Sequence, residues 1–83
     1  MTLLYFAWVR EKVGTGSETL ELPDDVKDVA GLIRWLSGRD EGYAAAFAQP
    51  ELIRVAVDQE HASHDAAVTE AREIAFFPPV TGG

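Results

Sequence analysis

The residues best suited to chemistry are the last six, Pro78-Pro79-Val80-Thr81-Gly82-Gly83, which we call the tail. Two consecutive prolines cannot donate hydrogen bonds to a strand ladder and they restrict φ, so the tail is predicted to leave the domain in an extended conformation. Six extended residues span at most about 20 Å, which is enough to carry the carboxylate of Gly83 into a pocket of another protein. Because Gly82 and Gly83 lack Cβ atoms, a channel of backbone width can admit them.

The chemistry expected of this carboxylate is acyl transfer. A carboxylate oxygen is a poor leaving group, so we expect activation by ATP to a glycyl-adenylate, from which sulfide or a persulfide displaces AMP and leaves a thiocarboxylate on Gly83. The alternative is that Gly82 and Gly83 form a frayed terminus, as terminal glycines commonly do. A strand that runs directly into Pro-Pro-Val-Thr-Gly-Gly favours the carrier interpretation.

Side-chain nucleophiles and phosphate loops are poorly supported. Cysteine is absent, which excludes disulfides, catalytic thiols and side-chain persulfides. Ser63 lacks the strand-to-helix elbow of a hydrolase. The segment Gly14-Thr15-Gly16 is followed by a predicted strand and not by a helix, so a hairpin turn is favoured over a phosphate cradle.

The two histidines, His61 and His64, lie among the acidic residues Asp58, Glu60 and Asp65. Such side chains can ligate metals, but the segment is a predicted exposed connection without the i, i+4 spacing of a helical metal site. We therefore predict no metal site and no bound cofactor; the adenylate and the thiocarboxylate are expected only as covalent intermediates.

The composition sets limits on partners and location. The 83 residues suffice for one small domain, and 7 basic against 14 acidic residues give a formal charge of -7. Nucleic acids and anionic membranes are therefore disfavoured as partners, and the acidity serves either solubility or attraction to a basic protein surface. No signal peptide or membrane span is evident in the sequence, so a cytoplasmic location is expected.

Hydrophobic patterning predicts an α+β domain over residues 1–77, followed by the tail over 78–83. A helix is predicted where Val29, Leu32, Ile33 and Leu36 share one face, with Asp25 or Asp28 as its N-cap and Ser37-Gly38 at its end. The other predicted elements are strands at 2–9, 18–22, 52–58 and 72–77, a short helix at 41–48, and a short edge strand within 59–71.

Aromatic residues in the first predicted strand suggest a docking surface. Strand alternation places Phe6 and Trp8 on one face, and Tyr5 and Ala7 on the other. Both sets cannot face the helix, so one set is expected to be available to a partner.

Four segments together resemble the MoaD family, the small subunits of molybdopterin synthase: LLYFAWVREKVG, DVAGLIRWL, VAVDQE and EIAFFPPVTGG. The resemblance covers almost the whole chain and is most specific at its two ends. It implies a β-grasp (ubiquitin-like) fold, with a mixed four- to five-stranded sheet, one main helix packed on one face and one short helix.

The resemblance also implies a pathway in which the chain is not catalytic alone. A MoeB-like enzyme would adenylate Gly83, a sulfur donor would convert the adenylate to a thiocarboxylate, and a MoaE-like large subunit would receive the tail. In the resulting heterotetramer the thiocarboxylate would donate sulfur to cyclic pyranopterin monophosphate.

The family pattern assigns binding roles by position. Phe6 and Phe77 match hydrophobic contacts to the large subunit, and Arg10 matches an arginine that helps to bind the activating enzyme. The tail residues Pro78, Pro79, Val80 and Thr81 would enter the partner ahead of Gly82 and Gly83. His61 occupies a third contact position that is usually aliphatic in the family.

Two other classes of function remain open at this point. One alternative is a related carrier, which serves thiamine synthesis or acts as a ubiquitin-like protein modifier. The chain is also compatible with a non-catalytic β-grasp interaction module whose tail is inert.

Overall fold

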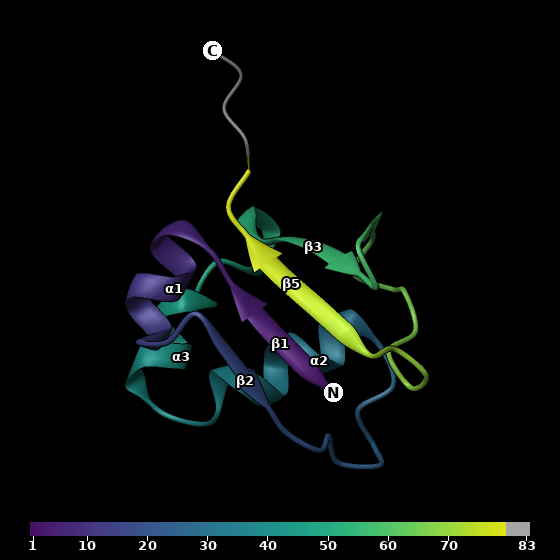
Figure 1. Cartoon of the computed structure of the whole chain (residues 1–83). Coiled ribbons are helices and arrows are strands. Elements are labelled where there is room, and N and C mark those ends of the chain that lie inside the picture. Colours follow the sequence, from purple (N-terminus) through teal and green to yellow (C-terminus); the bar gives the residue numbers. More distant parts are fainter. Residues whose placement is uncertain (80–83) are drawn as a thin grey trace.

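A computed structural model describes residues 1–79, and its centre is a mixed sheet of five strands in the order β2-β1-β5-β3-β4 (Figure 1). The central strand β5 runs parallel to β1 and antiparallel to β3, and the outer pairs β1–β2 and β3–β4 are antiparallel. The strands are β1 Thr2–Tyr5, β2 Ser17–Thr19, β3 Arg54–Val57, β4 Glu60–Ala62 and β5 Glu73–Phe77. The predicted mixed sheet is confirmed.

The helices are α1 Ala7–Val13, α2 Val29–Ser37, α3 Glu41–Ala46 and the 3-10 helix η1 Pro50–Leu52. In Figure 1, α2 lies behind the sheet, and α1 and α3 lie together at one side of it. None of the helices that the structure describes is long and apolar enough to cross a membrane.

Helix α2 forms as the sequence predicts. Val29, Leu32, Ile33 and Leu36 are its buried residues, and they follow the i, i+3, i+4, i+7 spacing of one helical face. Of the two proposed caps, Asp28 is the one used, because its carboxylate accepts a hydrogen bond of 2.8 Å from the Gly31 N–H. The predicted short helix is also present as α3.

The strand predicted at 2–9 is wrong beyond Tyr5. At Ala7 the backbone takes the left-handed region, φ 54°, and the chain turns from β1 directly into α1. The helix places Val9 in the core with Val13, four residues on, packed against it, and it ends at Gly14, whose φ of 97° suits a residue without Cβ. The fold therefore has one more α-helix than the sequence predicted.

Several element boundaries also differ from the prediction. Strand β2 covers Ser17–Thr19 and not 18–22, and Leu52 belongs to η1, because Pro50 begins a 3-10 turn before β3. Strand β5 starts one residue later than predicted, at Glu73. The predicted edge strand is confirmed as β4, and Asp58 and Gln59, both with positive φ, make the tight turn that precedes it.

The core lies between the sheet and the helices. Phe76 is fully buried and contacts two other aromatic rings, stacked on Tyr5 at 5.8 Å between ring centroids and edge-on to Phe47 at 5.2 Å. Leu3 and Ile74 are fully buried on neighbouring strands. These contacts fix the end of β5, from which the tail departs.

Replacing Gly42 by alanine should destabilise the fold, although alanine is the better helix former. A Cβ atom at Gly42 would lie 2.6 Å from the Lys12 backbone oxygen, so α1 and α3 would have to separate. We expect a loss of about 1–3 kcal/mol in the free energy of unfolding, measured by urea titration. The control is Gly38→Ala, where a Cβ atom would lie 3.6 Å from the nearest atom; equal losses in both variants would contradict the close-packing explanation.

Candidate docking face at the base of the tail

The central strand β5 ends at Phe77 and delivers Pro78 and Pro79, both half-buried, at one end of the sheet. The Phe6 N–H donates a hydrogen bond of 3.1 Å to the Phe76 carbonyl, which ties the exit of β1 to the end of β5. The predicted tail residues Val80, Thr81, Gly82 and Gly83 lie outside the described residues. The base of the tail is therefore the candidate functional site.

Phe6 is an exposed apolar side chain at this base, with 48% of its surface accessible. The sequence predicted Phe6 within the first strand, but it lies just after the end of β1. The left-handed turn at Ala7 sends the following residues into α1 and leaves Phe6 outside the core. A non-glycine residue in this region costs roughly 1–2 kcal/mol, so the fold retains a locally strained conformation next to the tail.

The sheet has one face away from the helices, and strand pairing identifies its residues. Leu4 pairs with Ala75, Ala75 with Ala56, and Phe77 with Arg54. Residues one position along on the same strands, such as Leu3, Ile74 and Val55, are buried, so the alternation assigns the first set to the open face. With Phe6 added, we define the docking face by five apolar residues, namely Leu4, Phe6, Ala56, Ala75 and Phe77.

His61 and Arg54 border the docking face at the β3–β4 side. His61 pairs with Ala56 across β3 and β4, and its ring meets the Phe77 ring edge-on, with centroids 5.5 Å apart. These two rings belong to strands on either side of β3, which would ordinarily stand about 9–10 Å apart. Ala56, the β3 residue that pairs with His61, has only a methyl side chain at this place.

Arg10 lies one helical turn after Phe6, and its N–H donates a hydrogen bond of 3.3 Å to the Phe6 carbonyl. It is an exposed residue of α1, and its guanidinium lies over Gly16, where a Cβ atom would come within 3.2 Å of it. An open groove of about 720 Å³ is lined here by Ala7, Arg10, Glu11, Gly14, Thr15 and Gly16. Residues 14–16 end α1 and lead into β2, so they are a connection between a helix and a strand and not the turn of a simple hairpin.

A polar cluster next to the base holds β2 against the helices. The Glu18 carboxylate accepts hydrogen bonds from the Tyr5 hydroxyl at 2.8 Å, from the Tyr43 hydroxyl at 2.5 Å and from Arg39 at 2.9 Å. Partial burial favours the neutral acid, but these three donors outweigh it and hold the pKa of Glu18 below its usual value. Burial, and then the hydrogen bond to Glu18, raise the pKa of Tyr5 strongly and the pKa of Tyr43 to about 12.

Replacing Glu18 by glutamine should lower stability at neutral pH by about 1–3 kcal/mol, because two phenols and a guanidinium lose a charged acceptor. A lowered folded-state pKa means that Glu18 stabilises the fold above its ordinary pKa, near 4.3, and that this contribution is lost as the pH falls through the folded value. The pKa values of the two tyrosines are shifted in the opposite direction, upward. The stability that these phenols contribute is therefore complete below about pH 10 and is lost as the pH rises further.

The measurement is thermal unfolding of wild type and Glu18→Gln from acidic to alkaline pH. The exposed Glu21 gives a matched control, Glu21→Gln. If wild type and the Glu18 variant lose stability in parallel on acidification, the Glu18 cluster is not the cause of the loss of stability at low pH.

The two histidines do not converge on a metal site. His64 Nε2 is 2.8 Å from the Ile53 carbonyl oxygen, whereas His61 lies against Phe77. Ser63 bonds the Asp65 carboxylate. Within residues 1–79 no group of three or more His, Cys, Asp or Glu side chains is placed to hold a metal ion.

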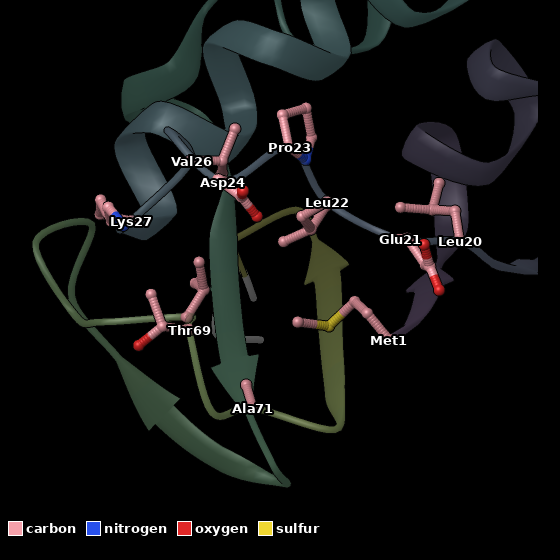
Figure 2. A pocket seen from close by; sticks show the side chains of 11 residues that line it. Met1, Leu20, Glu21, Leu22, Pro23, Asp24, Val26, Lys27, Thr69 and Ala71 are labelled. Atoms are coloured by element: carbon pink, nitrogen blue, oxygen red, sulfur yellow. The ribbon is translucent and has the colours of Figure 1, made fainter.

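A second groove, of about 710 Å³, lies at the opposite end of the sheet. Figure 2 shows the side chains of Met1 and Leu22 at this groove, with Ala71 below them. Met1 and Ala71 precede β1 and β5, whose other ends carry Phe6 and the tail. This groove therefore lies away from the docking face.

Of the five residues of the docking face, only Phe6 and Phe77 were predicted from the sequence as partner contacts, and that role stays a prediction. Leu4, Ala56 and Ala75 carry no functional signature by themselves, and only the pairing of β1, β5 and β3 brings them together. For α1 a signal was present, because Val9 and Val13 at i, i+4 are followed by Gly14.

Comparison with known proteins gives consistent similarities along the chain. Residues 3–83 match the ThiS family model. The chain is 40% identical over 81 residues to a molybdopterin synthase sulfur carrier subunit of Escherichia coli, covering 98% of this chain and 96% of that protein. It is 35% identical over 83 residues to the subunit of the same name in Haemophilus influenzae, covering 100% and 99%.

Solved structures support the fold assignment. A molybdopterin converting factor subunit 1 of Pyrococcus furiosus superposes with a TM-score of 0.73 at 25% identity, covering 95% of each chain. A second structure, SAMP1 from Haloferax volcanii, gives a TM-score of 0.70 at 25% identity and covers 100% of this chain and 98% of that one. The predicted ubiquitin-like β-grasp fold is confirmed.

Proposed function

The chain belongs to the ThiS/MoaD family of ubiquitin-like sulfur carriers, and from that membership we propose that it is the sulfur carrier subunit of a molybdopterin synthase. The observation that carries the proposal is the full-length similarity to subunits of that name in two bacteria. The geometry supports this proposal, because the central strand β5 ends at Phe77 and delivers Pro78 and Pro79 next to an apolar face left open by the helices.

The proposed chemistry takes place on the carboxylate of Gly83. A carboxylate oxygen attacks the α-phosphate of ATP, pyrophosphate leaves, and a glycyl-adenylate forms. Sulfide then adds to the acyl carbon, the C–O bond to AMP breaks, and a thiocarboxylate remains. If a persulfide is the nucleophile, an acyl disulfide forms first, and a second thiol of the sulfur donor breaks its S–S bond, which releases the thiocarboxylate and leaves a disulfide on the donor. Transfer of its sulfur to cyclic pyranopterin monophosphate, with water supplying the replacing oxygen, returns the carboxylate for another cycle.

The proposed role of the folded domain is to bind the partner and so to position the terminal carboxyl group. The chain contains no cysteine, so the sulfur is carried on the backbone carboxyl and not on a thiol. Docking through a rigid surface holds the tail at a fixed entry point and removes much of the entropy loss of bringing the reacting atoms together. The docking face is suited to that task, because one of its residues, Phe77, directly precedes Pro78.

Two partners are proposed to take up the tail in turn. A MoeB-like enzyme performs the adenylation, with Arg10 among its contacts, and a sulfur donor follows. A MoaE-like large subunit then binds Phe6 and Phe77, and two copies of each chain form a heterotetramer.

A protein modifier is the second candidate function. A small archaeal modifier protein of Haloferax volcanii has the same fold as this chain. In that case a lysine amine, and not a sulfur nucleophile, would attack the activated Gly83 and form an isopeptide bond. The two candidates differ in the product that the adenylate gives.

The test is the intact mass of the chain after incubation with the adenylating enzyme, ATP and a sulfur source. We expect one carboxyl oxygen to be replaced by sulfur, and the thiocarboxylated chain to yield molybdopterin when mixed with the large subunit and the pyranopterin precursor. A thiocarboxylate that forms but gives no molybdopterin would favour the thiamine alternative, and conjugates to other proteins would favour the modifier.

A further inference from the structure

The docking face carries positive charge at one edge, although the chain as a whole is strongly acidic. Arg54 is exposed and pairs with Phe77 in the β3–β5 register, so its side chain emerges beside that ring. The chain has 14 acidic residues against 7 basic ones and a net charge of -7, so an exposed cation beside the open apolar face is a local exception to the overall charge. Within residues 1–79 the ion pair observed is Arg39–Glu18, and it does not involve Arg54.

The His61 imidazole extends this edge. Its ring is held edge-on against Phe77, and within residues 1–79 it makes no hydrogen bond, unlike the ring of His64. The ring nitrogens of His61 are therefore available to a partner.

Within residues 1–79 no acidic side chain forms an ion pair with Arg54, and this includes Glu51 in η1, three residues before it. Glu60 neighbours His61 on β4, and alternation assigns it to the opposite face of the sheet. Asp58 accepts hydrogen bonds of 2.9 and 3.0 Å from the backbone N–H groups of Arg72 and Glu73, at the far end of β5. Glu73 is on the same face as Phe77 but four residues away along the strand.

We propose that the surface which receives this docking face is apolar at its centre and carries a carboxylate that pairs with Arg54 and accepts a hydrogen bond from His61. The inference rests on the proposed function, since it assigns this surface to the large subunit that takes up the tail. Charge complementarity is the reason for the carboxylate. Closing an apolar surface over Phe77 would strip water from Arg54, and a cation without a partner in such a place is costly.

This pairing also supplies specificity. Apolar contacts through Phe6 and Phe77 discriminate little between partner surfaces, whereas a positive charge on the partner opposite Arg54 would repel it and oppose binding. A carrier with this edge should therefore discriminate against large subunits that present a basic or purely apolar surface at the corresponding place.

The first experiment measures binding to the large subunit encoded in the same genome, by titration calorimetry. We expect Arg54→Glu to raise the dissociation constant at least about tenfold, and the remaining affinity to depend less on salt between about 0.05 and 0.3 M than that of wild type. The matched control is Arg34→Glu, the same change of charge at an exposed residue of α2, which should change binding less than about twofold.

The second experiment locates the carboxylate directly. Arg54→Lys places an amine at the edge, and a water-soluble carbodiimide would condense it with a neighbouring partner carboxylate to an amide, with water taken up by the reagent. Peptide mapping of the cross-linked pair should join residue 54 to an Asp or Glu of the large subunit. Arg34→Lys, treated in the same way, controls for random cross-linking, as do the native residues Lys12 and Lys27.

The outcomes separate this inference from the proposed function. If Phe77→Ala abolishes binding but Arg54→Glu behaves like Arg34→Glu, the inference of a partner carboxylate opposite Arg54 is wrong, and the proposed carrier function is unaffected. The assignment to the large subunit is equally wrong if Arg54→Glu weakens binding only to the adenylating enzyme, or only self-association of the chain. If wild type is never thiocarboxylated, the proposed function itself fails.

Discussion

Adding one alanine after Gly83 should abolish thiocarboxylate formation, while the unfolding midpoint stays unchanged. The added residue moves the carboxylate by about 3.5 Å and places a Cβ atom where only glycines stood. A displacement of about 1 Å can already cost a hundredfold in rate when reacting atoms must be aligned. Deleting Gly83 should have the same effect by shortening the reach.

The measurement is the intact mass of the chain after incubation with the adenylating enzyme, ATP and a sulfur source. One alanine added at the amino terminus, beside Met1, is the control, because it lengthens the chain equally at the other end of the sheet. A carrier extended after Gly83 that still acquires sulfur at the wild-type rate would show that the terminal carboxylate is not the reactive group.

Phe76→Ala and Phe77→Ala should have opposite consequences, although the two residues are neighbours. Phe76 is fully buried between Tyr5 and Phe47, so its truncation leaves a cavity and should cost about 3–5 kcal/mol. The total free energy of unfolding of a small domain is only about 5–15 kcal/mol, so this loss is a large part of it. Phe77 lies on the open face, so its truncation should leave the fold intact and weaken docking at least about tenfold.

Urea unfolding and titration with the large subunit give the two readouts. Phe6→Ala provides the matched control, since Phe6 is an exposed phenylalanine of the same docking face and should resemble Phe77→Ala in both measurements. If Phe77→Ala proves as destabilising as Phe76→Ala, the ring of Phe77 is part of the core and the docking face has been wrongly assigned.

The sequence predicted α2 well because its signals are local and agree with one another. Four apolar residues at helical spacing, a capping aspartate three residues before Gly31, and Ser37-Gly38 at the end all lie within eleven residues. Such elements need little tertiary information, because the interactions that define them join residues close in the chain.

Helix α1 was missed because its first residues have the composition of a buried strand. The run from Leu3 to Val9 is continuously apolar, and such a run does not distinguish strand from helix. The decision is made at Ala7, whose left-handed backbone has no signature in an alanine. Phe6 is exposed, as strand alternation predicted, but Trp8, assigned to the same face, belongs to α1. The role of Phe6 in binding a partner stays a prediction.

The sequence alone determined the sulfur-carrier hypothesis, because Pro78, Pro79, Gly82 and Gly83 are consecutive or nearly so and their chemistry depends on order and not on packing. Tertiary structure decided which side chains surround the base of the tail. Leu4, Arg54, Ala56, His61 and Phe77 come from four strands, and they adjoin one another only because β5 inserts between β1 and β3. Strand order is set by burial over the whole sheet, which no local segment encodes.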